Sequence, residues 1–89
     1  MSEKVLFVCS TPPTDEYGGF YQFIIVKRKN RYILEILDII NEHGLRVWQH
    51  MYTYINTKQK DKIIQMLREG RFEELYEDEE LNNKEFYIL

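Results

Sequence analysis

The sequence predicts an α+β domain. In this fold a four-stranded, mostly antiparallel meander sheet is covered by one or two C-terminal helices, and the apolar C-terminus can add a short last strand. The chain has 89 residues, enough for one small domain. Apolar residues make up 44% of it and charged residues 30%, which is typical of a globular rather than a disordered chain. Within residues 1–55 the apolar residues form strand-like runs separated by loops. After residue 55 the apolar residues recur at helical spacing.

The first two expected strands flank a long loop. Residues 5–9 are a continuous run of β-branched and aromatic types, which predicts a short buried strand over residues 4–10. Two prolines and two glycines indicate a loop over residues 11–19, because proline removes a backbone donor and glycine admits a positive φ. The second strand is expected over residues 20–28.

The third strand is expected over residues 31–40. Lys29 and Asn30 can form the tight turn before it, because asparagine tolerates a left-handed φ. A helix is the alternative for this segment, since its apolar residues also fit helical spacing, but its β-branched content favours a strand. A loop with Gly44 in a left-handed conformation then leads to the fourth strand, over residues 45–55.

Helices are expected after the sheet. Asn56 or Thr57 can cap a helix from about residue 58 to 69, because either side-chain oxygen can accept a hydrogen bond from a free backbone N–H. Gly70 would end that helix. A second short helix is expected over about residues 72–80, after which the apolar residues near the C-terminus either pair as a last strand or dock elsewhere.

The charge is small overall and unevenly distributed. Twelve basic and fifteen acidic residues give a net charge of −3, which argues against a strongly basic nucleic-acid binder. Residues 73–85 nevertheless hold seven acids and one base. This acidic segment is either a recognition element or a solvated helix face that favours solubility. Its candidate binding residues are Glu77, Asp78, Glu79 and Glu80.

Few residues suit catalysis or metal binding. Residues 3–9 resemble the strand and nucleophile that open the low-molecular-weight tyrosine phosphatases, but Asp15 stands where those enzymes need an arginine. A carboxylate there would repel phosphate, so Cys9 is expected to be a small buried apolar residue. His43 and His50 show no zinc-site spacing. The sequence therefore predicts a protein that is not an enzyme and has no metal or cofactor.

No targeting or membrane segment is expected. No run approaches the roughly 18–20 consecutive apolar residues of a membrane span. The apolar run over residues 5–9 is also too short for the core of a signal peptide. A cytoplasmic protein without a membrane partner is therefore expected.

The fourth strand carries the candidate binding surface. Period-two alternation predicts one cationic and aromatic side, formed by Arg46, Trp48, His50, Tyr52 and Tyr54. Such side chains are typical of protein interfaces, and they also stack on the bases of single-stranded nucleic acids. For a nucleic acid, phosphates would be bound by Lys27, Arg28, Lys29 and Arg31 at the hairpin tip and by Lys58, Lys60 and Lys62 at the helix start.

Two functional hypotheses follow. The strands over residues 20–28 and 31–40 are apolar on both faces, so a homodimer or a different protein partner is expected to cover the face that the helices leave. The leading hypothesis is a small interaction protein of the inhibitor, antitoxin, immunity-protein or phage-regulator type, which binds through the aromatic side, the acidic segment or both. The alternative is a single-stranded nucleic-acid-binding protein whose acidic segment shields its basic body.

Overall fold

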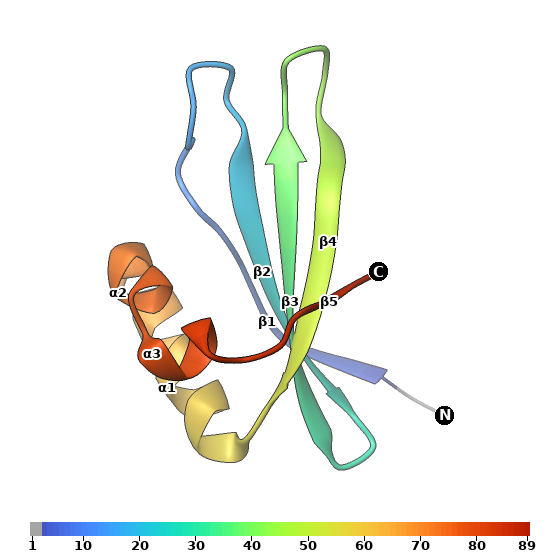
Figure 1. Cartoon of the computed structure of the whole chain (residues 1–89), viewed down its shortest axis with the longest axis vertical. Helices are drawn as coiled ribbons and strands as arrows, with labels where there is room; N and C mark the ends of the chain where they lie inside the picture. Colours follow the sequence, from blue (N-terminus) through green and yellow to red (C-terminus); the bar gives the residue numbers. More distant parts are fainter. Residues whose placement is uncertain (1–2) are drawn as a thin grey trace.

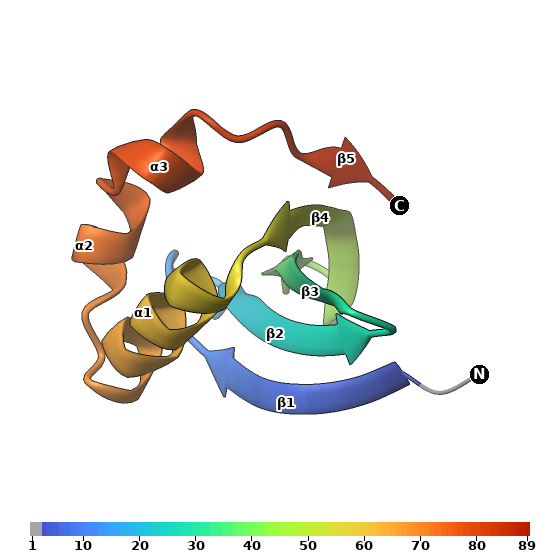
Figure 2. The same ribbon diagram turned by 90° about the horizontal axis from the view of Figure 1, so that it is seen from below.

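Residues 3–89 are described by the computed structural model, and they form one antiparallel sheet with three helices on one side of it (Figures 1 and 2). The elements are, in chain order, β1 (Glu3–Ser10), β2 (Phe20–Arg28), β3 (Arg31–Ile40), β4 (Arg46–Ile55), α1 (Thr57–Arg68), α2 (Phe72–Tyr76), α3 (Glu79–Asn82) and β5 (Tyr87–Ile88). The five strands lie side by side in the order β1-β2-β3-β4-β5. The predicted α+β class and the antiparallel meander are confirmed, and the C-terminus adds the last strand.

The β2–β3 hairpin is the centre of the sheet. It pairs in unbroken register, with Ile25 opposite Leu34, so the helical alternative for β3 is excluded. The predicted two-residue turn is present, but the residue with positive φ is Lys29, at 56°, and not Asn30. Arg28 lies opposite Arg31, and a two-residue hairpin loop needs a positive φ at its first position in order to match the strand twist. The loop geometry therefore decides which residue becomes left-handed.

The core lies between the sheet and the helices. Phe23, Ile25 and Leu34 project from the middle strands and are buried against Ile63 of α1 and Leu75 of α2. Apolar residues at period-two spacing in the strands therefore meet apolar residues at helical spacing in the helices, as the sequence predicts. The whole buried cluster comprises Phe23, Ile25, Leu34, Ile55, Ile63, Met66, Leu67, Leu75 and Leu81.

The first helix has the predicted cap at each end. The side chain of Asn56 accepts a hydrogen bond from the backbone N–H of Gln59 at 2.8 Å, and the side chain of Gln59 accepts one from the N–H of Asn56 at 3.0 Å. Gly70, with a φ of 70°, follows the last turn of α1. The longest helix within residues 3–89 has only 12 residues, and none is long and apolar enough to cross a membrane.

The single helix predicted over residues 72–80 is wrong, because two short helices occupy this part of the chain. The break falls at Asp78, which adopts an extended conformation with φ −67° and ψ 117°. Its carboxylate accepts a hydrogen bond from the backbone N–H of Leu81 at 3.1 Å and so begins α3. Aspartate is favoured at the N-cap, where its side chain accepts a hydrogen bond from a free backbone N–H, and it is unfavourable in the interior of a helix.

Candidate functional site

The sheet face that points away from the helices carries the predicted binding strand, and we call it the open face. Side chains directly opposite each other in antiparallel strands share a face, so the strand pairing defines its members. They are Glu3, Val5, Val8, Ser10, Phe20, Gln22, Ile24, Val26, Arg28, Arg31, Ile33, Glu35, Leu37, Ile39, Val47, His50, Tyr52, Tyr54 and Tyr87. Val26 and Ile33 are buried yet lie outside the core on the helix side, which supports this assignment.

Eight of these nineteen side chains are aliphatic, and the exposed ones among them lie on strands β1 and β4. Val5 of β1 is 57% exposed and Val47 of β4 is 52% exposed, at opposite edges of the four long strands. Leu37 and Ile39 are half-buried between them on β3. Scattered exposed apolar residues are ordinary, whereas a continuous apolar surface rimmed by polar groups marks an interaction site.

Three tyrosines lie together on this face. The ring of Tyr52 is 6.0 Å from that of Tyr54 in an edge-to-face arrangement and 5.4 Å from that of Tyr87. The guanidinium of Arg31 lies 4.5 Å from the centroid of the Tyr54 ring. These contacts hold the rings in position before any partner binds. The sequence points to Tyr52 and Tyr54 but not to Tyr87, because only the pairing of β5 with β4 brings Tyr87 beside them.

A hydrogen-bonded pair, Glu35 and His50, lies among the aliphatic and aromatic residues of this face. His50 Nε2 lies 2.6 Å from Glu35 Oε1, and the two side chains are 30% and 16% exposed. Glu35 is opposite Tyr52 and His50 is opposite Leu37, so the pair runs diagonally between β3 and β4. The pair thus places two polar side chains among aliphatic and aromatic groups, and each fixes the orientation of the other.

The predicted alternation holds only for the second half of β4. Gln49 lies opposite Asp38, but the next pair is Val47 with Ile39, so the register shifts by one residue at Trp48. This shift places Val47 on the open face and Arg46 on the opposite face. The prediction that Arg46 shares a face with His50 is therefore wrong, because an extra residue in one strand reverses the parity beyond it. Trp48 itself is 66% exposed.

Part of the acidic segment is used for contacts within the domain. Asp78 caps α3 and its carboxylate also accepts a hydrogen bond from Lys62, which holds the pKa of Asp78 below its usual range. Glu80 accepts a hydrogen bond from Gln59 Nε2 at 3.0 Å. Two of the four predicted acidic binding residues therefore join α3 to α1, whereas Glu77 and Glu79 are exposed.

The basic residues predicted at the β2–β3 hairpin tip and those predicted at the start of α1 lie at the same end of the molecule. Lys27 of β2 and Lys60 of α1 lie 5.7 and 4.8 Å from the centroid of the same Tyr32 ring. Their charges are partly neutralised, since Lys60 pairs with Asp61 at 2.9 Å. The other predicted phosphate contacts are Arg28, which pairs with Glu3 at 2.9 Å, Lys62, which is bound to Asp78, and the exposed Lys29, Arg31 and Lys58.

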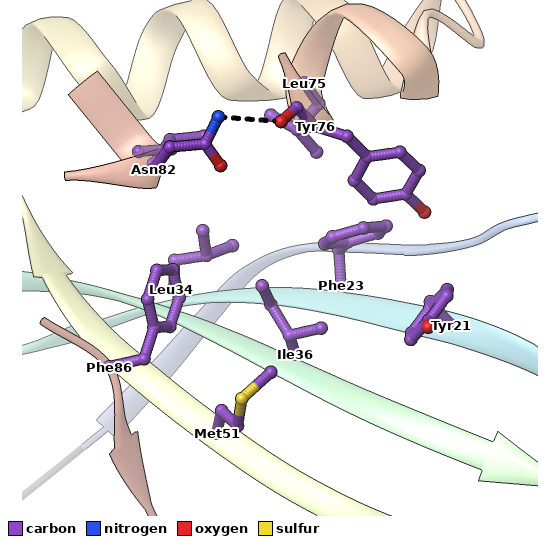
Figure 3. A pocket seen from close by; sticks show the side chains of 10 residues that line it. Tyr21, Phe23, Leu34, Ile36, Met51, Leu75, Tyr76, Asn82 and Phe86 are labelled. Atoms are coloured by element: carbon purple, nitrogen blue, oxygen red, sulfur yellow. Dashed lines mark hydrogen bonds between the residues drawn. The ribbon is translucent and has the colours of Figure 1, made fainter. Parts of the chain in front are cut away.

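A cavity of about 350 Å³ lies on the other side of the sheet, between the strands and the C-terminal helices (Figure 3). Its lining residues are Tyr21, Phe23, Leu34, Ile36, Met51, Leu75, Tyr76, Leu81, Asn82 and Phe86. Asn82 Nδ2 donates a hydrogen bond to the backbone carbonyl of Tyr76 at 2.9 Å. Burial raises the pKa of the Tyr76 hydroxyl, and Tyr21 adds to this effect. No local sequence pattern predicts this cavity, because its walls come from strands and helices that are distant in sequence.

Groups suited to metal or nucleophilic chemistry are dispersed. Within residues 3–89, no three side chains of His, Cys, Asp or Glu are grouped so that they could hold a metal ion. The half-buried thiol of Cys9 is directed at the backbone carbonyl of Leu67, with Sγ 3.8 Å from the oxygen. His43 lies exposed in the loop between β3 and β4.

Comparison with known proteins provides no relative from which a role could be transferred. No protein-family model matches the chain, and neither the curated proteins nor the solved structures searched contain a significant match. The function must therefore be inferred from the geometry of the chain itself.

Proposed function

We propose that this protein is a non-enzymatic binding module whose open face docks on the surface of another protein. The observation that supports this proposal is the combination of exposed aliphatic residues with a fixed cluster of tyrosines on one sheet face. Protein interfaces combine an apolar centre with a polar rim and are enriched in tyrosine and arginine. Rings already fixed by their neighbours lose little conformational entropy on binding, which favours a tight contact.

The charges around the open face suggest the chemistry of the partner. Arg28 and Arg31 lie at the hairpin end of this face, with Lys29 between them in the turn. Glu3 pairs with Arg28, but within residues 3–89 no ion pair engages Lys29 or Arg31. We therefore propose a partner protein whose contact surface is apolar and bordered by carboxylates on the side that meets this hairpin.

The open face suits a nucleic acid less well than a protein. A single-strand platform needs free cations beside stacking rings, because phosphate contacts supply most of the affinity. At the centre of this face the candidate His50 is hydrogen-bonded to Glu35. The cation that a nucleic acid could use is Arg31, which lies over the Tyr54 ring at the hairpin end of the face. The basic residues around Tyr32 lie at one end of the molecule and leave nucleic-acid binding as the competing outcome to be tested.

Site-specific photo-crosslinking in the source cells tests the proposal. The photoreactive residue p-benzoylphenylalanine would replace Tyr54 or Val47 on the open face in two variants, and the exposed Glu79 of α3 in a matched control. We expect the two open-face variants to crosslink to the same protein and the Glu79 variant not to do so. Leu37→Glu in the same background should abolish the adduct, because it places a charge in the apolar interface.

Other outcomes would overturn the proposal. Crosslinking from position 79 alone would assign binding to the acidic segment. Adducts formed only with a second copy of this chain would make the open face a homodimer interface. Adducts with nucleic acid would support the single-strand alternative, as would saturable quenching of Trp48 fluorescence by short single-stranded RNA or DNA that weakens with added salt.

A further inference from the structure

We propose that the cavity between the sheet and the C-terminal helices binds a small, neutral, aromatic molecule that carries one hydrogen-bond donor. This site is separate from the open face, because its strand residues, such as Leu34 and Ile36, lie on the helix side of the sheet. The proposal therefore does not depend on the proposed function. It rests on the size of the cavity, its uncharged lining and the orientation of one amide.

The cavity lies between two layers that meet incompletely. The sheet contributes the side chains of Phe23, Ile36 and Met51, which point toward the helices. The helices contribute Leu75 and Asn82 on the opposite side of the cavity (Figure 3). Its volume of about 350 Å³ lies within the range of about 300–1,000 Å³ that small-molecule sites occupy. This is enough room for a molecule of one or two fused rings.

The lining determines that the ligand is neutral and apolar. None of the ten lining residues is an acid, a lysine, an arginine or a histidine. A charged ligand would therefore lose its hydration without gaining an opposite charge. Aromatic walls come from Tyr21, Phe23, Tyr76 and Phe86, and rings prefer such surroundings. The thioether of Met51 adds a polarisable and adaptable contact.

Asn82 supplies the polar recognition. Its Nδ2 is engaged by the carbonyl of Tyr76 at 2.9 Å, which fixes the orientation of the amide. Figure 3 shows the amide oxygen of Asn82 turned down from the helix layer toward the sheet, on the side where Leu34 and Phe86 lie. That oxygen is an acceptor, so a ligand hydroxyl or ring N–H within reach would donate to it.

The C-terminal segment forms one wall of the cavity. It consists of the short helices α2 and α3 and of Phe86, the residue before β5. The side-chain oxygen of Thr53 donates to the carbonyl of Glu85 at 2.9 Å and so ties this segment to β4. The cavity is open to solvent on one side, which gives a ligand a route into it.

Methyl NMR of methionine-labelled protein tests the proposal with three probes: indole, 1-methylindole and indole-3-acetate. Indole is neutral and has one donor, 1-methylindole lacks the donor, and indole-3-acetate is anionic. We expect indole to shift the methyl signal of Met51 in a saturable manner. Met66, which lies in the core but does not line the cavity, serves as an internal control. One hydrogen bond predicts roughly three- to tenfold weaker binding of 1-methylindole, and we expect no binding of indole-3-acetate.

Two matched variants locate the binding. Ile36→Phe fills the cavity and should weaken indole binding at least tenfold, whereas Leu37→Phe, the neighbouring residue on the open face, should leave it unchanged. The Met51 signal in the unmodified protein keeps the test valid if Ile36→Phe fails to fold. The proposal is overturned if Met51 does not respond to millimolar indole, if Leu37→Phe weakens binding as much as Ile36→Phe, or if all three probes bind equally.

Discussion

Glu35 and His50 form a hydrogen-bonded pair across β3 and β4, among aliphatic and aromatic side chains of one sheet face, with 2.6 Å between the carboxyl oxygen and the imidazole Nε2. Both side chains are partly shielded from solvent. A pair in this position adds little to stability, because the loss of hydration offsets most of the attraction. We expect it to limit unselective binding, because it interrupts the aliphatic and aromatic part of this face.

A double-mutant cycle tests this interpretation. We expect Glu35→Leu and His50→Leu each to lower the free energy of unfolding, and the double variant to lose less than the sum, with a coupling of about 0.5–1 kcal/mol. Urea unfolding followed by circular dichroism measures these differences. The double variant should also elute as oligomers in size-exclusion chromatography. Strictly additive losses would show that the two side chains do not stabilise each other.

Asp78 is expected to stabilise the fold rather than to recognise a partner. Asp78→Ala should lower the free energy of unfolding by about 0.5–2 kcal/mol, because it removes the cap of α3 and the partner of Lys62. Asp78→Asn should lose less, since asparagine also caps a helix. Chemical unfolding of the two variants beside the unmodified protein gives the comparison, and equal stabilities would contradict the structural role.

The same carboxylate predicts a pH dependence. Lys62 and the backbone N–H groups of α3 hold the pKa of Asp78 below its unfolded-state value. Its contribution is therefore complete above the unfolded pKa, at about pH 4, and is lost as the pH falls through the lower folded pKa. We expect the stability difference between the unmodified protein and Asp78→Asn to shrink in this acidic range and to stay constant between pH 6 and 8. A gap that widens on acidification would refute this assignment.

Thr53 is expected to hold the C-terminal strand. Thr53→Val keeps the shape of the buried side chain but removes the hydrogen bond to the carbonyl of Glu85, with an expected loss of about 0.5–1.5 kcal/mol. The amide of Leu89, which donates to the carbonyl of His50 at 2.9 Å, should then exchange with deuterium faster. Thr57→Val, at an exposed helix position, is the control. Unchanged exchange at Leu89 would show that this contact does not secure β5.

The turn between β2 and β3 offers a stabilising substitution. Lys29 holds a φ of 56°, which is strained for a residue with a Cβ atom. Lys29→Gly should therefore raise the free energy of unfolding by up to about 1 kcal/mol, although the greater freedom of glycine in the unfolded chain offsets part of the gain. Asn30→Gly should lower it, because φ at position 30 is not positive. Thermal unfolding of both variants decides whether the strain lies at position 29.

Local patterns determined the elements of this protein. The bounds of β2 and β3, the start of α1 at Asn56 and its end before Gly70 follow from residues close to one another in sequence. The same is true of the position of His50, Tyr52 and Tyr54 on one face, because alternation along a strand is a local property. The sequence also shows that the sheet is apolar on both faces, which predicts a partner.

Pairing between distant segments decided the rest. The register shift opposite Ile39 moved Arg46 to the other face, and no signal within β4 marks that shift. Three further features depend on side chains from separate strands or helices. They are the Glu35–His50 pair, the contact between Tyr87 and Tyr52, and the apolar cavity. Periodicity specifies which face of the sheet a side chain occupies. It does not specify which residue that side chain contacts, because the register between neighbouring strands determines the contact.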